Sequence, residues 1–381
     1  MDLKRTHQAD SWIELDASAF ARNVEIFRSL AERSRLFCVL KANAYGHGLR
    51  ETAGILAPLA DGLAVFNIDE AITLRFSYPD IPVLVLGPAH EHRIEEASRR
   101  SLELTASSMD QVAVMAEKNC PIRVHLKLET GTNRQGIREE HLETIANTIS
   151  RSPHITAAGV YTHFANIEDT TDHTFAMQQL QRFEDMTGKL ADLGIKPACR
   201  HTACSAAALL FPESLYDMCR IGISMYGLWP SPQTRVSFTH RYPDREVPSL
   251  KPVLTWKARL TQVRKVKEGD YIGYGLSYRA TRDLRIGVLG VGYSDGYDRR
   301  LSNQAFVLIR GKRAPVRGKI CMNMTMIDLT DIPDARSGDT AVLLGNQNGD
   351  SITAETLAGM VDTINYEIVA RIGSHLPRIP V

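Results

Sequence analysis

The chain has no long hydrophobic run, and its first residues contain no apolar signal core. A membrane-spanning helix needs about 20 apolar residues, so we expect no transmembrane segment, no secretory leader and a cytoplasmic protein. The six cysteines form no CxxC pair, and several lie within apolar segments. This pattern argues against a disulfide framework or a zinc site, and it predicts reduced, mostly buried thiols and no metal.

An excess of charge of either sign is also missing, because 45 Lys and Arg residues stand against 44 Asp and Glu residues. No global field therefore favours nucleic acid or an anionic membrane as a partner, and any anion site must be local. The sequence has no internal repeat beyond alternating secondary structure and no low-complexity tract. Its 381 residues are enough for two domains.

Short apolar segments recur along the first two thirds of the chain, with amphipathic helical patterns such as Ser18–Arg33 between them. The eight expected strands are Phe37–Leu40, Leu63–Phe66, Val83–Leu86, Leu102–Thr105, Val124–Leu128, Ala158–His163, Ala198–Thr202 and Cys219–Tyr226. Eight strands that alternate with helices predict an α/β fold, a TIM-like (β/α)8 barrel.

The pattern changes after Pro230–Pro248, a polar stretch with several prolines that we expect to be a linker. Closely spaced strand patterns and turn signals follow, and short helices are expected only near the end. The expected elements are strands at Val253–Leu260, Ile286–Val291, Phe306–Ile309, Met326–Leu329 and Ala341–Leu344, and helices at Ala354–Met360 and Tyr366–Ile372. We therefore expect a barrel domain over residues 12–245 and a mainly β domain over 246–381, with residues 1–16 packed against the latter.

The segment 39–48, VLKANAYGHG, carries the most chemical information, because its lysine follows a buried strand. Such a lysine must reach solvent, find a partner or lose its charge. A neutral amine is a nucleophile that condenses with an aldehyde. Tyr45, Gly46 and Gly48 predict a flexible turn at which a phenol and the backbone approach a ligand. Taken alone, Lys41 fits a strand that ends in solvent better than it fits a catalytic amine.

Other polar residues fall at the ends of expected barrel strands, where barrel active sites form. Ser205 opens a helix after the seventh strand, so its hydroxyl either caps that helix or faces a phosphate. Arg220 is a cation in an apolar segment and pairs with a carboxylate or a ligand. A lone barrel histidine is more often a hydrogen-bonded core residue than a catalyst, so we expect His163 and His201 to surround a site without acting in it.

Five motifs occur in order along nearly the whole chain, and together they resemble those of the alanine racemase family, whose members use pyridoxal 5′-phosphate (PLP). The motifs are VLKANAYGHG at 39–48, KLETGTNRQG at 127–136, MCRIGISMYG at 218–227, GYGLSY at 273–278 and NYE at 365–367. The resemblance implies an isomerase that interconverts L-alanine and D-alanine, works as a homodimer with shared active sites and supplies D-alanine for peptidoglycan.

The resemblance also assigns roles to individual residues. Lys41 carries PLP and is one base at Cα, and the partner subunit's Tyr274 is the second base on the opposite face. Arg220 faces the pyridine nitrogen and leaves it largely unprotonated, since arginine does not readily release a proton. Arg134 binds the phenolic oxygen and the substrate carboxylate, and Met322 is expected at the substrate. The other cofactor-binding residues are Tyr45, His163, Ser205, Gly222, Ile223 and Tyr366, and the surrounding supporting residues are Lys127, His201, Tyr293, Arg299 and Asn323.

The chain departs from the family pattern at four positions. Glu129 stands where aspartate is commoner, Cys204 where asparagine is frequent, Asn323 where aspartate is usual and His375 where arginine is common. Because Cys204 and Asn323 leave specificity open, a serine or broad-specificity racemase is the alternative; Tyr366 would crowd a side chain larger than methyl and favours alanine. Lys127 is carbamylated in many members, and the sequence leaves its state here open.

Three other interpretations of the same barrel are weaker. A PLP decarboxylase would resemble enzymes with a glycine-rich phosphate loop, which is missing here. A PLP-binding regulatory module would have no need of a second base such as Tyr274. A sugar-phosphate enzyme would bind phosphate without a chromophore.

Overall fold

The computed structural model describes residues 9–381, which fall into two compact units. One unit comprises Ser18–Ala42 and Ala53–Lys251, and the other comprises the described residues up to Ala17, Asn43–Thr52 and Pro252–Val381. Residues 1–8, part of the segment expected to pack against the C-terminal domain, lie outside the described residues. Nowhere in 9–381 is a helix both long enough and apolar enough to cross a membrane.

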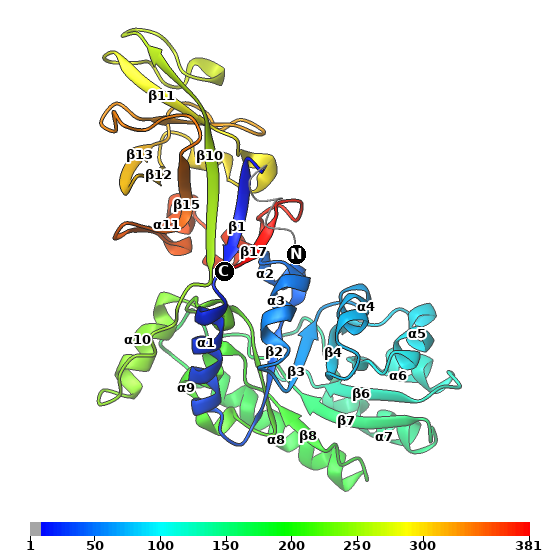
Figure 1. The fold of residues 1–381 in the computed structure, drawn as a ribbon. Helices are drawn as coiled ribbons and strands as arrows, with labels where there is room; N and C mark the ends of the chain where they lie inside the picture. Colours follow the sequence, from blue (N-terminus) through cyan, green and yellow to red (C-terminus); the bar gives the residue numbers. More distant parts are fainter. Residues whose placement is uncertain (1–8) are drawn as a thin grey trace. The chain divides into compact units, whose positions relative to one another are not determined.

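The first unit contains a sheet of parallel strands (Figure 1). Its eight strands within the described chain are β2 (Arg35–Val39), β3 (Gly62–Val65), β4 (Val83–Pro88), β5 (Glu103–Ala106), β6 (Ile122–Lys127), β7 (Ile155–Tyr161), β8 (Cys199–His201) and β9 (Met218–Ile221). They pair in the order β8-β7-β6-β5-β4-β3-β2-β9. The open edge between β8 and β9 is bridged by hydrogen bonds from Asp217 N to Arg200 O (3.0 Å) and from Arg220 N to Ala203 O (2.9 Å). The sheet is therefore a nearly closed barrel, as the strand pattern predicted.

Helices surround this sheet, as Figure 1 shows. They are α1 (Ala17–Leu30), α3 (Leu49–Leu56), α4 (Ile68–Ser77), α5 (Ile94–Arg99), α6 (Met109–Ala116), α7 (Leu142–Ser150), α8 (Thr174–Asp192), α9 (Ser205–Leu210) and α10 (Pro232–Arg241), with short 3-10 turns η2 (Glu91–Arg93), η3 (Glu139–His141), η4 (Pro212–Ser214) and η5 (Ile223–Tyr226). Because helices cover the outside and side chains fill the inside, β3 and β5 are buried along their whole length. Helix α1 contributes Phe20, Val24 and Phe27, spaced to lie on one face.

Two expectations for this unit are wrong. Pro230–Pro248 is not an irregular linker throughout, because α10 begins within it. Ser231 accepts a hydrogen bond from Thr234 N (3.0 Å) as N-cap, and Pro232 occupies the first helical position, where its missing N–H costs nothing. The expected last strand is also too long, because the chain leaves extended geometry at Gly222 and continues as η5.

The second unit is mainly β. Its strands are β1 (Ser11–Leu15), β10 (Leu254–Val266), β11 (Leu284–Leu289), β12 (Phe306–Ile309), β13 (Lys312–Pro315), β14 (Thr325–Asp328), β15 (Thr340–Gln347), β16 (Asp350–Ile352) and β17 (Arg378–Pro380), and its helices and turns are α11 (Ala354–Met360), α12 (Asn365–Ala370), η6 (Tyr274–Leu276), η7 (Tyr293–Asp295) and η8 (Arg299–Leu301). The short helix α2 (Lys41–Tyr45) ends in this unit. A mainly β C-terminal domain is therefore confirmed.

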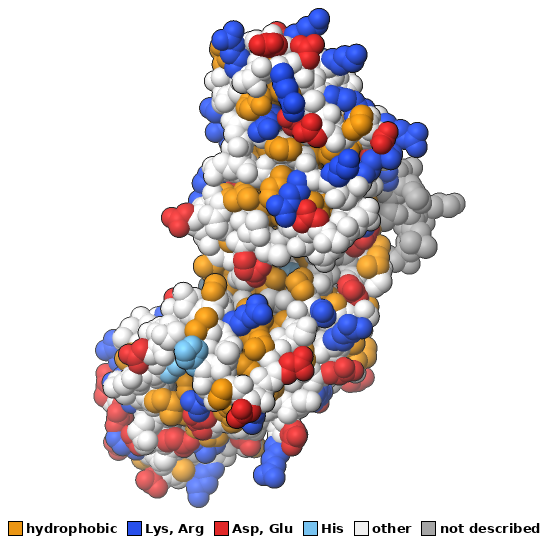
Figure 2. Space-filling model, turned by 90° about the vertical axis from the view of Figure 1, so that its left-hand side faces the viewer, with side chains coloured by type: hydrophobic (Ala, Val, Ile, Leu, Met, Phe, Trp, Pro, Cys, Tyr) orange, Lys and Arg blue, Asp and Glu red, His pale blue; other side chains and the backbone are white. Residues whose placement is uncertain are grey.

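The long strand β10 organises this sheet, because its first half pairs with β1 and its second half with β11. The register places Ile13 opposite Trp256, and Trp256 packs edge-on against Tyr297 at a centroid distance of 5.8 Å. A smaller apolar cluster of Ile272, Ala280, Leu284 and Ile286 supports the loop that contains η6. On the face drawn in Figure 2, acidic and basic side chains are interspersed on each unit, in keeping with the near-zero net charge.

Candidate active site

The segment after β2 is a left-handed helical turn rather than the flexible turn expected from its glycines. Residues 42–45 of α2 all have φ between 53° and 55°. An L-residue in this conformation costs about 1–2 kcal/mol, so four in succession need compensating contacts. Tyr45 is 9% exposed within this turn, and its ring lies 6.2 Å from that of Tyr366 on α12.

Hydrogen bonds from three side chains hold the turn. Asn43 Oδ1 accepts from Leu49 N (2.8 Å), and His47 Nδ1 lies 3.0 Å from the carbonyl oxygens of both Ala44 and Tyr45. Since carbonyls only accept, His47 carries its proton on Nδ1, and burial lowers the pKa of this histidine to about 4, which keeps the ring neutral. Arg378 Nη2 donates to Gly46 O (2.8 Å), which ties the end of the chain to the turn. The strained backbone is thus stabilised by two side chains of its own segment, Asn43 and His47, and by Arg378 near the end of the chain.

The amine of Lys41 is surrounded by conditions that favour its neutral form. Desolvation is the main cause of its lowered pKa, followed by the positive charge of Arg134, and Arg220 acts in the same direction; Glu168 and Glu70 oppose them. A lysine shifted in this way is a better nucleophile near neutral pH.

Two more cations are Lys127, the last residue of β6, and Arg134 in the loop that follows this strand. Burial, followed by Arg134 and Arg220, lowers the pKa of Lys127 to about 8. The loop is closed by a bridge between Leu128 and Ile137, and Glu129 Oε1 accepts from Gly131 N (2.7 Å). Glu129 therefore caps the turn of its own loop.

Arg220, at the end of β9, is 5% exposed and donates to four acceptors. Its Nη1 donates to Nδ1 (2.5 Å) and O (3.1 Å) of His201, and its Nη2 donates to the carbonyls of Thr162 (2.9 Å) and Thr202 (3.2 Å). The guanidinium also lies over the ring of Tyr161, with its central carbon 4.9 Å from the centroid. Arg220 is rigidly oriented and pairs with no carboxylate in these contacts.

Ser205 is the first residue of α9, and Cys204 is the N-cap, so the serine does not cap the helix with its own side chain. Instead, Ser205 Oγ accepts from Gly222 N at 3.1 Å. The contact brings Gly222, and Ile223 next to it, beside Ser205, as the predicted phosphate site requires. Its hydroxyl hydrogen is left to donate elsewhere. Cys204 is a free, buried thiol whose pKa is raised by burial to about 11.

His163 follows β7 and is partly buried. Desolvation, then the charges of Arg220 and Lys41, hold its pKa well below the usual value, so the ring is neutral. Its carbonyl accepts from Thr132 Oγ1 (2.7 Å), which joins the loop after β7 to the loop after β6.

In the second unit, the predicted residues at 293 and 322–323 lie on adjoining loops. Tyr293 N donates to Cys321 O (3.0 Å), Ser294 N donates to Met322 O (3.0 Å), and Asn323 Nδ2 donates to Ser294 Oγ (2.7 Å). Tyr274 on η6 is 72% exposed, and Tyr293 and Met322 are 41% and 56% exposed. Each of these three side chains is therefore open to contact with a second molecule.

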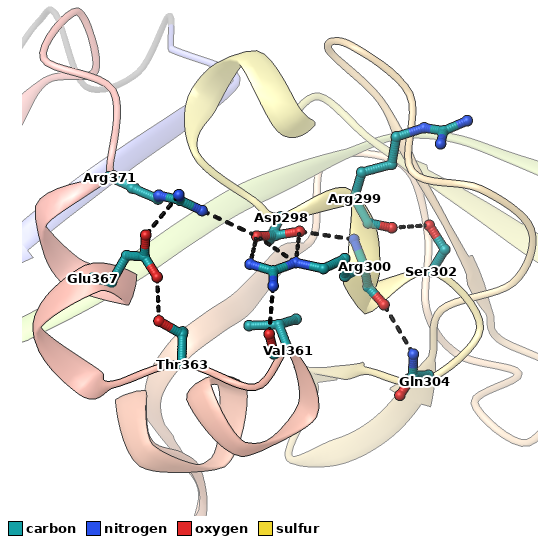
Figure 3. A network of polar contacts seen from close by, with 9 residues as sticks. All are labelled: Asp298, Arg299, Arg300, Ser302, Gln304, Val361, Thr363, Glu367 and Arg371. Carbon is teal, nitrogen blue, oxygen red and sulfur yellow. Dashed lines mark hydrogen bonds and ion pairs between the residues drawn. The ribbon is translucent and has the colours of Figure 1, made fainter.

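An ion-pair network around Asp298, the residue before Arg299, is shown in Figure 3. Asp298 accepts from Arg300 Nη2 (2.8 Å) and Arg371 Nη1 (3.4 Å), and Arg371 also pairs with Glu367 on α12 (2.6 Å). The side chain of Arg299 points away from this network (Figure 3). Burial raises the pKa of Cys321, and the positive charge of Arg299 acts against this effect. The network therefore links the helix that carries Tyr366 to the loop that carries Arg299.

Several residues of the site were missed by the sequence interpretation. His125 contacts His201 on the barrel interior, and His47 and Arg378 hold the turn after Lys41. His125 is two residues before Lys127 on the same strand and so shares its face, which is the signal that points to it. Among the described residues, no group of three or more His, Cys, Asp and Glu side chains is placed to hold a metal ion.

A TIM-like barrel with a lysine of lowered pKa and clustered cations at its strand ends is the architecture of a barrel enzyme that acts on anionic ligands. The comparisons identify the family. Residues 15–230 match the sequence model described as "Alanine racemase, N-terminal domain", and residues 253–380 match "Alanine racemase, C-terminal domain". The chain belongs to the alanine racemase family.

Individual relatives agree over nearly the full length. The alanine racemase of Leptospira interrogans serogroup Icterohaemorrhagiae serovar Lai is 37% identical over 97% of this chain and 96% of its own, and that of Carboxydothermus hydrogenoformans is 39% identical over 97% and 99%. Among solved structures, alanine racemase from Bacillus anthracis with bound L-Ala-P superposes with a TM-score of 0.91 at 32% identity, covering 98% of this chain and 95% of that one. The Streptomyces coelicolor A3(2) enzyme gives 0.87 at 32% identity, covering 99% of both chains.

Proposed function

We propose that this protein interconverts L-alanine and D-alanine with PLP as cofactor, acting as a homodimer. The observation that carries the proposal is the group of four cations Lys41, Lys127, Arg134 and Arg220, which are close enough to lower the pKa of both lysines. Family membership supports the reaction, and the resemblance supports a cytoplasmic location and a role in providing D-alanine for peptidoglycan.

The donor set fits PLP. A cofactor with a phosphate and a phenolate, together with a substrate carboxylate, would neutralise this excess of positive charge. Lys41 offers a readily deprotonated amine, and the Ser205 hydroxyl retains a hydrogen to donate to phosphate, with Gly222 N already satisfied by that oxygen. Arg220 retains one donor for the pyridine nitrogen, Nε–H, since its four other N–H groups are engaged. PLP would also be contacted by Tyr45, His163, Ile223 and Tyr366.

When bound, PLP joins its aldehyde carbon to an amine and withdraws electrons from the Cα of the substrate. Lys41 would hold the cofactor, and once substrate replaced it, its neutral amine would take or return the Cα proton on one face. Arg134 would orient the substrate carboxylate by forked hydrogen bonds, beside Met322. Arg220, fixed as a donor, would leave the pyridine nitrogen unprotonated and so limit electron withdrawal, which disfavours transamination.

The partner subunit's Tyr274 would act on the opposite face of Cα. Inversion by two opposed groups avoids moving a single base around the substrate. The 72% exposure of Tyr274 supports this assignment, because a buried phenol would be unable to enter another molecule's site. Tyr293, Asn323 and Arg299 on neighbouring loops would surround the same entry, and His201 and Lys127 would orient Arg220 and Arg134.

The test combines four measurements on the purified protein. We expect the visible absorbance of lysine-bound PLP, borohydride attachment of the cofactor to Lys41 on mass spectrometry, exchange of the Cα hydrogen of both alanine enantiomers in D₂O, and a dimer by light scattering. Lys41→Ala should abolish exchange and regain part of it with added methylamine, whereas Lys251→Ala, an exposed lysine of the same unit, should retain it. A colourless protein, or exchange that persists in Lys41→Ala without an amine, would refute the proposal. Faster exchange with serine would move the substrate assignment to serine.

A further inference from the structure

A continuous chain of hydrogen bonds runs through the first unit from Arg220 to the opposite end of the strands. Arg220 Nη1 lies 2.5 Å from His201 Nδ1, His201 Nε2 lies 2.8 Å from His125 Nδ1, and His125 Nε2 lies 3.1 Å from Glu103 Oε2. Arg123 donates to the other oxygen, Glu103 Oε1, from Nε (3.1 Å) and Nη2 (2.9 Å). His125 and His201 are at most 1% exposed, so water does not interrupt the chain.

The position of every proton in this chain follows from one fact. Arginine only donates, so His201 Nδ1 must be the acceptor of the contact with Arg220. A neutral His201 then carries its proton on Nε2 and donates to His125 Nδ1. His125 in turn has its proton on Nε2 and donates to Glu103. A second proton on either ring would place two donors face to face, so both imidazoles are neutral Nε2–H tautomers.

Glu103 is the acceptor in which the chain ends. It is 8% exposed, and burial raises its pKa, but the hydrogen bond from His125 and the hydrogen bonds and positive charge of Arg123 outweigh burial and lower the pKa below its usual value. Desolvation, then the charge of Arg220, lowers the pKa of His201 well below its usual value. A carboxylate at this end and a guanidinium at the other therefore polarise the two rings in one direction.

The stacking around His201 restricts the ring further. Tyr161 lies parallel to it at a centroid distance of 4.6 Å and an interplanar angle of 10°, and Tyr161 OH is fixed by Thr105 Oγ1 at 3.0 Å. His201 is thus unable to turn its other edge toward Arg220 without displacing Tyr161. A change in the hydrogen bond at one nitrogen of His201 therefore alters the hydrogen bond at the other nitrogen and is not relieved by rotation of the ring.

We propose that Glu103 is a positioning residue for Arg220 and that it acts through His125 and His201. It keeps His201 Nδ1 electron-rich, so that this nitrogen is a strong acceptor for the guanidinium. The relevance of Glu103 to catalysis rests on the proposed function, in which Arg220 faces the pyridine nitrogen. Glu103 never touches the cofactor. Its carboxylate strengthens each hydrogen bond of the chain and fixes the direction in which Arg220 presents its remaining donor, Nε–H.

The experiment uses the protein with ¹⁵N-labelled histidine and, separately, ¹⁵N-labelled arginine, both before and after loading with PLP. In the parent protein, His125 and His201 should show an unprotonated Nδ1 and a protonated Nε2, unchanged through the pH range near 6.5 in which free histidine titrates. Glu103→Gln, which keeps the shape but removes the charge, should shift the resonances of both rings and of the Arg220 guanidinium. Asp61→Asn breaks a comparable pair with Arg28 in the same unit and should leave them unchanged.

The outcomes separate this inference from the proposed function. A protonated Nδ1 or a doubly protonated ring in the parent protein would overturn it, even if Glu103→Gln failed to fold. A response confined to His125 would overturn the action on Arg220. If PLP failed to bind while both rings and Arg220 responded to Glu103→Gln, the positioning would stand and the proposed function would fail. In the loaded enzyme we expect Glu103→Gln to reduce kcat by roughly 10-fold with a smaller change in KM.

Discussion

Replacement of Gly46 by alanine tests whether the turn after Lys41 is held by the tight approach of two segments far apart in sequence. Gly46 has φ +83°, and a Cβ at this position would lie 1.9 Å from Val369 O and 2.8 Å from Val369 C. Both atoms belong to the backbone of α12, so no side-chain rotation relieves the contact. Either the turn or α12, which carries Tyr366, must move.

The expected cost has two parts. The left-handed conformation costs an L-residue about 1–2 kcal/mol, and forced overpacking adds about 1–3 kcal/mol. Two glycines of the same unit separate these parts. Gly349 has φ +90° and Gly359 lies in α11, and a Cβ on either would meet no atom within 4 Å. Gly349→Ala should therefore lose only the conformational part, and Gly359→Ala should gain up to about 1 kcal/mol from helix propensity.

The assay is urea unfolding of the parent and the three variants at one pH, together with the PLP content of each purified protein. We expect Gly46→Ala to lose about 2–5 kcal/mol of the free energy of unfolding and to retain less PLP, because Tyr45 and Tyr366 would shift. If Gly46→Ala cost no more than Gly349→Ala, the close approach of the turn to α12 would not contribute, and the reasoning would be refuted.

Three further predictions follow from the site. Tyr274→Phe should slow Cα hydrogen exchange from one alanine enantiomer more than from the other, and an equal loss for both in D₂O would contradict a division of the two faces. The pKa of Lys127 is about 8 in the folded protein against 10.5 unfolded, so at pH values between the two the folded state binds fewer protons. In carbonate-free buffer the free energy of unfolding should therefore rise with pH over this range, relative to that of Lys127→Met. If the two proteins had parallel pH profiles, Lys127 would not be neutral in the folded state. Asp298→Asn should weaken its pairing with Arg300 and Arg371 and lower the urea midpoint of unfolding slightly, because solvent screens these half-exposed arginines; an unchanged midpoint would show that the network does not stabilise the fold.

The periodicity of apolar residues predicted much of the fold. The eight barrel strands were located to within a few residues, apart from the last, and Phe306–Ile309 and Ala354–Met360 were predicted with their observed bounds. These elements follow from local patterns, because a buried strand or an amphipathic helix records its own environment in its spacing. The prediction of a linker was wrong because Pro232, a helix breaker by residue type, occupies the first position of a helix that Ser231 caps.

The local motifs likewise identified Lys41, Ser205 and Arg220 as the chemically informative residues, although their individual roles remain proposals. The left-handed turn at 42–45 was not predicted, because the residue types there have no intrinsic preference for four positive φ angles in succession. The hydrogen-bond chain from Arg220 to Glu103 was not predicted either, because its members come from different strands.

Residue types and their spacing along the chain thus determined the succession of elements, the family and the positions at which chemistry is to be expected. Tertiary structure alone decided which partners surround those positions: Arg378 reaches Gly46 from 332 residues away, and His125 meets His201 from a different strand. The reason is physical. Helix and strand patterns reflect interactions between near neighbours, whereas the pKa of an amine, the tautomer of an imidazole and the strain that a turn can bear depend on groups that only folding brings together.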